Sequence, residues 1–122
     1  MDGPPEGFYY GIYHQQFSIQ IYFELSMDKQ NGYDRLLRAK IDSFQSYLRR
    51  ASLSKRNKEL YTNFIKVMNR LYNMRFRRIN APSEKRLESL EDDIADPKNW
   101  LVEREWLLEK IRQIKDYWNK RR

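Results

Sequence analysis

A chain of 122 residues is long enough for one domain that buries about two-thirds of its unfolded surface, and 40% hydrophobic residues give it the means to fold. The chain has no cysteine, which excludes disulfides, thiolate metal sites and a cysteine nucleophile. The lack of cysteine also suits a reducing compartment, so we expect a cytoplasmic protein. Because the formal net charge is +7, we expect its surface to be basic.

The first segment, residues 8–25, fits either a strand or a helix. Residues 17–25 alternate apolar and polar side chains, which is typical of a half-buried strand. Nothing else in the chain alternates, so such a strand would have no partner, and an unpaired strand is not stable. We therefore predict a helix that buries one side and turns into the next helix at Asn31-Gly32. The side chains expected on that buried side are Tyr10, Tyr13, Phe17 and Ile21.

Two helices are predicted in the middle of the chain. In residues 33–51, apolar side chains recur every three or four positions and line one face: Leu37, Ile41, Phe44, Leu48 and Ala51. Between Ser54 and about Arg78, two adjacent apolar columns predict a widely buried helix: Leu60, Phe64, Val67, Leu71 and Met74, and beside them Tyr61, Ile65, Met68 and Tyr72. Ser54 suits the N-cap of this second helix.

The C-terminal third predicts a short acidic helix and a longer one. Residues 80–83 break the preceding pattern, and Leu87, Leu90 and Ile94 then recur at helical spacing. We expect Asp96-Pro97 to end this helix and to start the next, with Asp as the N-cap and Pro in the first turn. One face of the last helix would carry Trp100, Leu107, Ile111, Ile114 and Trp118.

These elements predict an all-α fold of about five helices in antiparallel helical hairpins, as a bundle or a short α-solenoid fragment. We expect a single helical domain over residues 1–122. Its parts would be an aromatic N-terminal segment (1–32), a basic helical hairpin (33–80), and an acidic short helix followed by the C-terminal helix (81–122).

Several runs of residues resemble a known class of helical proteins. They are Phe23-Glu24-Leu25, Asp34-Arg35-Leu36-Leu37, residues 43–50, Asn63-Phe64-Ile65-Lys66, Arg70-Leu71-Tyr72 and residues 103–110. Over residues 20–111 the chain is similar to the C-terminal part of uncharacterised, tetratricopeptide-like bacterial proteins. The resemblance implies a helical-repeat fold and no particular chemistry. The chain departs from a true tetratricopeptide repeat, because it has no period near 34 residues and no Trp, Gly and Tyr at the signature spacing.

The side chains for catalysis are scarce, and we predict no enzyme, no cofactor and no small-molecule substrate. His14 is the only histidine and lies beside two glutamines. The carboxylates of residues 84–96 lack the glycine and spacing of a calcium loop, so we predict no metal site. Polar side chains interrupt the apolar stretch of residues 8–25, so we predict no membrane span.

Charge is segregated along the chain. Residues 33–80 carry thirteen bases and three acids, whereas residues 81–105 carry four bases and eight acids. Most clusters of bases fall in or just beyond a predicted last helical turn, where cations are favourable. The candidate anion or polyanion contact is Arg49, Arg50, Lys55, Arg56 and Lys58, because its last three members crowd a first helical turn. Either an anion or the acidic helix near residues 84–96 would compensate them.

Trp106 with Arg104 is the candidate protein contact. Trp106 lies off the main apolar stripe of its helix, and Trp and Arg are enriched at binding hot spots. Burial against another segment is the alternative for this tryptophan. We therefore expect a non-catalytic protein-interaction or scaffold module that binds a protein partner or a second copy of itself and is part of a larger helical-repeat protein. The alternative is nucleic-acid or other polyanion binding through residues 49–58.

Overall fold

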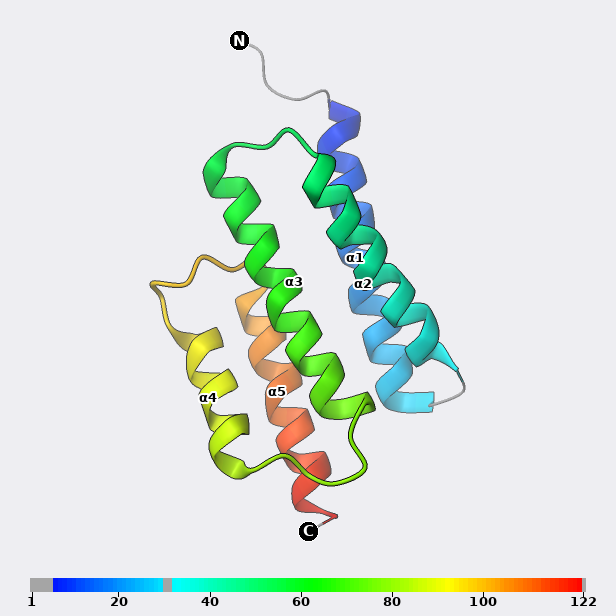
Figure 1. Cartoon of the computed structure of the whole chain (residues 1–122), viewed down its shortest axis with the longest axis vertical. Coiled ribbons are helices and arrows are strands. Elements are labelled where there is room, and N and C mark those ends of the chain that lie inside the picture. The colour runs from blue at the N-terminus through cyan, green and yellow to red at the C-terminus, as the bar shows by residue number, and fades with distance from the viewer. Residues whose placement is uncertain (1–5, 30–31, 122) are drawn as a thin grey trace. The chain divides into compact units, whose positions relative to one another are not determined.

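The computed structural model describes residues 6–29 and 32–121, with side chains described from residue 11 onward except at residue 29. Within these ranges it contains five helices and no strand (Figure 1). The helices are α1 (Glu6–Lys29), α2 (Tyr33–Arg50), α3 (Lys55–Phe76), α4 (Glu84–Ala95) and α5 (Arg104–Asn119). The predicted all-α fold of about five helices is confirmed.

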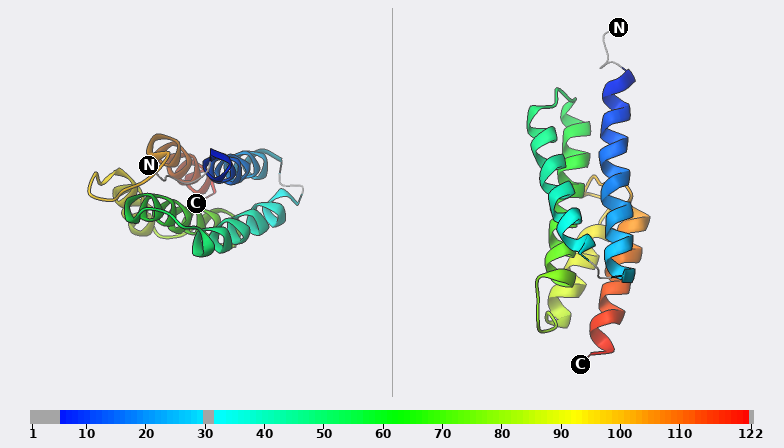
Figure 2. Two further views of the ribbon diagram at one scale, coloured as in Figure 1. Left: turned by 90° about the horizontal axis from the view of Figure 1, so that it is seen from above. Right: turned by 90° about the vertical axis from the view of Figure 1, so that its right-hand side faces the viewer.

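The chain divides into two compact units, Met1–Lys55 and Arg56–Arg122. In the first unit, α1 and α2 contact each other and run in opposite directions, as Figure 2 shows, so they form an antiparallel hairpin. The second unit contains α4 and α5, which also contact each other, and nearly all of α3. The prediction of one domain over residues 1–122 stays a prediction.

The prediction of a helix over residues 8–25 is correct, but the predicted buried face of α1 is wrong. Tyr13, Phe17 and Ile21 are 49%, 54% and 57% exposed, and the side chain of Tyr10 lies outside the described residues. The buried side chains lie along a different line, with successive steps of four, three, four and three residues: Ile12, Gln16, Ile19, Phe23 and Ser26. The exposed stripe of Tyr13, Phe17 and Ile21 is called the α1 stripe below.

Two polar residues on the buried line explain why the pattern was misleading. Gln16 Nε2 donates to Gln20 Oε1 at 3.2 Å, and Ser26 Oγ donates to the carbonyl of Tyr22 at 2.7 Å. Each side chain therefore makes a hydrogen bond within α1, which lowers the cost of its burial. A prediction that assigns the buried face of a helix from its apolar residues alone cannot detect hydrogen bonds that polar side chains make within the helix.

Helix α2 follows its predicted pattern closely. Leu37, Ile41, Phe44 and Leu48 are buried on one face, as expected from their spacing. Gly32 precedes the helix with φ +83°, a left-handed conformation that glycine adopts without steric cost. Gly11 of α1 lies where a Cβ atom would be 3.1 Å from Tyr47 Oη, so its lack of a side chain permits close approach of α2.

Helix α3 is buried over a wide face, which confirms the two predicted columns. Eight of the nine column residues are buried and Leu60 is half-buried. The buried eight are Tyr61, Phe64, Ile65, Val67, Met68, Leu71, Tyr72 and Met74. Because these columns line one side of the helix, most polar side chains of α3 lie on the other side, while Arg75 is buried.

Helix α4 has the predicted bounds and buried residues, Leu87, Leu90 and Ile94. Ser83 is its N-cap, with Oγ accepting from the backbone N–H of Arg86 at 3.2 Å. The predicted start of the last helix at Asp96-Pro97 is wrong. Asp96 instead forms a turn in which Oδ1 accepts from the backbone N–H of Lys98 at 2.9 Å, and α5 begins only at Arg104.

The late start of α5 removes Trp100 from its buried face. Trp100 lies in the loop of residues 96–103 and is 42% exposed, whereas Leu107, Ile111, Ile114 and Trp118 are buried as predicted. Trp118 links α5 to α3, because its Nε1 donates to the backbone carbonyl of Met74 at 2.9 Å. This buried bond and the α4–α5 packing hold the second unit together.

The two faces of α1 predict different effects of the same substitution. Phe23→Ala removes a fully buried ring and should lower the free energy of unfolding by about 3–5 kcal/mol. Phe17→Ala, on the exposed α1 stripe, should change it by no more than about 0.5–1 kcal/mol. Urea unfolding in dilute solution, followed by circular dichroism, measures both. Equal losses would show that the assignment of the buried face is incorrect.

Candidate anion-binding site

Four arginines line one groove between the C-terminal half of α3 and the N-terminal half of α4. The groove encloses about 460 Å³ and is lined by Arg70, Asn73, Met74, Arg77, Arg78, Arg86 and Ser89. It is called the arginine groove below. All seven residues belong to the second unit, so the groove is formed within one compact part of the chain.

The spacing of these residues explains why they converge. Arg70, Asn73 and Arg77 are three and seven positions apart, so they share one face of α3 or its immediate continuation. This is the face that the apolar columns leave exposed. Arg86 and Ser89 are three positions apart on α4 and line the same groove from that helix. Buried Met74 forms an apolar part of the lining.

The charge of the arginine groove is only partly balanced. Arg70 Nη1 lies 2.8 Å from Asp93 Oδ2, in an ion pair whose side chains are 41% and 52% exposed and therefore worth at most about 1 kcal/mol. Arg78 Nε donates to the carbonyl of Asn80 at 3.1 Å. Among the described residues, no carboxylate pairs with Arg77, Arg78 or Arg86. Guanidinium groups bind phosphate and carboxylate through paired hydrogen bonds, so this groove is suited to an anion.

A smaller groove adjoins the first one. It encloses about 260 Å³ and is lined by Asn63, Lys66, Val67, Arg70, Asp93, Asn99 and Leu101. We call it the loop groove, because Asn99 and Leu101 come from the loop before α5. Arg70 lines both grooves, so they adjoin at this side chain, whose ion pair with Asp93 connects α3 to α4.

Trp100 lies beside the loop groove. The Nδ2 of Asn63 donates to the backbone carbonyl of Trp100 at 2.9 Å, which ties the loop to α3. The guanidinium of Arg56 lies 5.3 Å from the centroid of the Trp100 ring, within the range of a cation–π contact. An exposed aromatic ring thus lies near one end of a row of basic residues that includes Arg56, Lys66 and Arg70.

The structure places the five residues of the predicted anion contact in two different units. Arg49, Arg50 and Lys55 belong to the first unit, and Arg56 and Lys58 to the second. All five are exposed. The arginines end α2, where the helix dipole favours them, while the first turn of α3 has no acidic residue. Arg56 is the member that adjoins the newly found grooves.

The acidic helix pairs with bases other than the predicted ones. Glu91 accepts from Lys115 Nζ at 2.8 Å and from Arg112 Nε at 3.0 Å, while Asp93 pairs with Arg70. The hydrogen bonds from Lys115 and then Arg112 lower the pKa of Glu91, and the bond to Glu91 raises the pKa of Lys115. Glu91 therefore pairs with α5, and Asp93 pairs with α3.

Arg104, a predicted protein contact, forms bonds to the chain's own backbone. Its Nη1 donates to the carbonyls of Ile94 and of Asp96, the latter at 2.8 Å, and its Nη2 donates to the carbonyl of Asn99. These bonds join the end of α4 and the following loop to the first residue of α5. Glu103, which precedes α5, has a φ of 59°, an unfavourable left-handed conformation.

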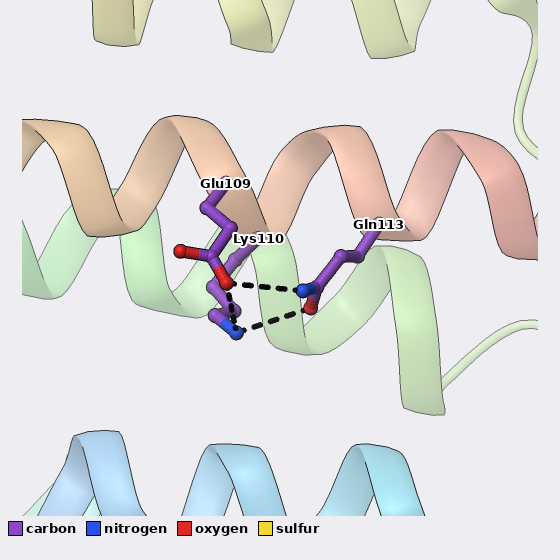
Figure 3. A network of polar contacts seen from close by, with 3 residues as sticks. All are labelled: Glu109, Lys110 and Gln113. Atoms are coloured by element: carbon purple, nitrogen blue, oxygen red, sulfur yellow. Dashed lines mark hydrogen bonds and ion pairs between the residues drawn. The ribbon is translucent and has the colours of Figure 1, made fainter.

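Trp106, the other predicted protein contact, is half-buried. The Nζ of Lys110 lies 5.4 Å from the centroid of its ring. Lys110 is itself 1% exposed and is held by Gln113 Oε1 at 3.1 Å and by Glu109 Oε1 at 3.4 Å (Figure 3). Gln113 also donates to Glu109, so the three side chains form a closed network on α5.

A second group of arginines is internal to the second unit. The guanidinium of Arg75 lies 3.6 Å from the centroid of the Tyr117 ring and that of Arg121 lies 3.4 Å from it. Only one guanidinium fits on each face of a ring at such distances, so the two flank Tyr117. Burial lowers the pKa of Arg75, Arg121 adds to this shift and Tyr117 opposes it. These arginines serve packing between α3 and the end of α5.

Comparison with family models, curated proteins and solved structures gives no match. The resemblance to tetratricopeptide-like proteins therefore stays a prediction. Across residues 6–29 and 32–121, no group of three or more histidines and acidic residues is arranged to hold a metal ion. No helix of the described chain has the length and apolar character needed to cross a membrane. His14 is exposed on α1.

Sequence reasoning missed the arginine groove, although a signal for it was present. Polar residues recur on α3 at positions 63, 66, 70 and 73 and just beyond it at 77, with the helical steps of three and four that were used for the apolar columns. The same periodicity that identified the core therefore identified an exposed polar column. The contribution of α4 was not visible, because it depends on how α4 packs.

The bonds of Arg104 predict a structural role. Arg104→Ala removes donors to three carbonyls and should lower the free energy of unfolding by about 1.5–3 kcal/mol. Arg104→Lys should lose less, because one ammonium retains part of the bonding. Arg49→Ala, at an exposed position, is the control and should stay within about 0.5 kcal/mol of the original protein. Unchanged urea unfolding of Arg104→Ala would restore Arg104 as a candidate partner contact.

Proposed function

We propose that this chain is a non-catalytic binding module that holds the anionic groups of a partner in the arginine groove. The observation that carries this proposal is the convergence of Arg70, Arg77, Arg78 and Arg86 on one groove. Three of the four have no carboxylate partner among the described residues. A partner that supplies phosphate or carboxylate groups would neutralise them.

The cost of assembling such a groove supports a role in binding. Like charges repel at the distances found within one groove, and this repulsion reduces the stability of the folded chain unless an anion is bound. Arginine is also the base best suited to the task, because its planar group makes two parallel hydrogen bonds with one phosphate or carboxylate. On a surface where the charges are dispersed and solvated, lysine would serve as well as arginine. All four basic residues that line this groove are nevertheless arginines.

Reversing two of the groove's charges should weaken this binding strongly. Arg77→Glu with Arg78→Glu should elute from immobilised heparin at much lower salt than the original protein. For inorganic polyphosphate, the slope of log affinity against log salt should become shallower by about 1–2, because each lost phosphate contact contributes about 0.7–0.9. Circular dichroism verifies that the variant folds.

The matched control is Arg49→Glu with Arg50→Glu, which alters net charge equally at exposed positions in the other unit. It should retain most of the binding. Equal losses in the two variants would indicate a general charge effect and contradict the arginine groove. A larger loss in the control would favour residues 49–58 instead.

A second candidate function is self-association through the α1 stripe. Tyr13, Phe17 and Ile21 are about half exposed and four positions apart, so they form a continuous apolar line on α1. Residues 11–23 contain no Asp, Glu, Lys or Arg, although 34% of the whole chain is charged. Two copies of a chain with net charge +7 repel each other, and they repel least through an uncharged surface. A second copy is therefore the partner that fits this stripe.

A charge placed on the α1 stripe should prevent this association. The original protein should sediment as a dimer at high concentration, and Phe17→Glu should sediment as a monomer, because two buried carboxylates would face an apolar contact. Leu36→Glu, at an apolar position on α2 that is 48% exposed, is the matched control and should remain dimeric. A monomeric original protein at every concentration would refute this candidate function.

A further inference from the structure

We propose that the anionic partner is a single-stranded nucleic acid, whose backbone follows the exposed face of α3 and one of whose bases stacks on Trp100. This inference rests on the proposed function, because it uses the arginine groove to hold phosphates. It adds the class of the ligand, its path and the residue that distinguishes it from other polyanions.

The path is defined by one column of polar side chains. Arg56, Asn63, Lys66, Arg70, Asn73 and Arg77 follow one another at steps of seven, three, four, three and four residues, and the exposed carboxylate of Glu59 lies within the first step, three residues after Arg56. Such steps keep all six on one side of a helix and its immediate continuation. At about 1.5 Å per residue, the column from Arg56 to Arg77 extends over about 32 Å, which accommodates several consecutive phosphates.

The two grooves lie next to each other along this column. They share Arg70, so a chain-like ligand that occupies both would contact this guanidinium where they adjoin. The grooves and Arg56 together present six basic side chains. The only carboxylate among the residues that line the two grooves is that of Asp93. A ligand with regularly repeated anionic groups matches a row of basic side chains better than a single phosphate does.

Trp100 is the feature that favours a nucleic acid over other polyanions. Its ring is 42% exposed, although tryptophan is usually buried for most of its area. The hydrogen bond from Asn63 to its backbone carbonyl ties the loop to α3, and Arg56 lies near its ring. The ring is therefore held on the surface next to a positive charge. An aromatic ring next to a groove rich in basic side chains is the usual platform for stacking of unpaired nucleobases.

The requirement for an exposed base face specifies a single strand. In a duplex, both faces of every internal base are covered by neighbouring bases, so a tryptophan on the protein surface cannot stack on them. The exposed amide of Asn73 and hydroxyl of Ser89, which line the arginine groove, add neutral hydrogen-bonding groups next to the phosphate-binding arginines. An acidic peptide would satisfy the arginines but would make no use of a stacking platform.

The test compares strands that differ only in their bases. A fluorescently labelled oligothymidylate is titrated with the full chain and followed by anisotropy, next to a strand of the same number of phosphates that carries no bases. The oligothymidylate should bind roughly 5- to 150-fold more tightly, the range expected for stacking of one base. A duplex of the same length should bind more weakly than the oligothymidylate.

Substitutions at Trp100 locate the effect. Trp100→Ala should reduce affinity for oligothymidylate to that for the base-free strand, while Trp100→Phe should retain most of it, since phenylalanine keeps a stacking face. Ile79→Ala removes another exposed apolar side chain of the same unit, 97% exposed, and should leave both affinities unchanged. Circular dichroism confirms the folding of each variant.

The outcomes separate this inference from the proposed function. Equal binding of both strands, still weakened strongly by Arg77→Glu with Arg78→Glu, would overturn base stacking and leave anion binding intact. Competition by polyglutamate as strong as that by oligothymidylate at equal charge would overturn a nucleic-acid ligand in favour of an acidic protein. Failure of every polyanion to bind would overturn both proposals.

Discussion

The constraint on which the second unit depends is the wide burial of α3. Two adjacent apolar columns line one side of this helix, and their residues are almost all buried. Most polar residues between Arg56 and Arg77 are thereby left to the other side, with the exception of Arg75, which is buried. Arg56, Lys66, Arg70 and Arg77 are thus aligned in a row on that side. The same hydrophobic burial that stabilises the unit also concentrates its charge, since the position of each base is set by the spacing of the apolar residues.

The partition of the acidic residues completes this arrangement. Helix α4 lies beside the row of bases, yet its Glu91 pairs with Lys115 and Arg112 of α5. Asp93 is the carboxylate that reaches the grooves, where it pairs with Arg70. The chain therefore uses its described acidic pairs to join α4 to its neighbours and leaves the end of the arginine groove positive. Arg104 contributes to the same surface indirectly, because its bonds to three carbonyls order the loop that presents Trp100.

The sequence was sufficient for the parts of the fold that depend on local periodicity. The columns of α3, the face of α2 and the buried residues of α4 all follow from apolar spacing, and the structure confirms them. The face of α1 was not predictable in this way, because Gln16 and Ser26 are buried with their hydrogen bonds made inside the helix. The start of α5 was misplaced because Asp96 suits both an N-cap and a turn, and the bonds of Arg104 stabilise the turn. The arginine groove required the packing of α4 on α3, which no local pattern contains.

The helix dipole does not account for the arginine groove. A cation is favoured near the C-terminal end of a helix, and this explains Arg77 and Arg78, which follow the end of α3 directly. Arg70 lies within α3, where the dipole has little effect. Arg86 is the third residue of α4, in a first turn where the dipole opposes a positive charge. Two of the four arginines therefore converge on the groove without any benefit from the backbone, and Arg86 does so against it. Arg70 is compensated by its ion pair with Asp93, whereas the placement of Arg86 is explained neither by the helix dipole nor by a carboxylate of the described residues.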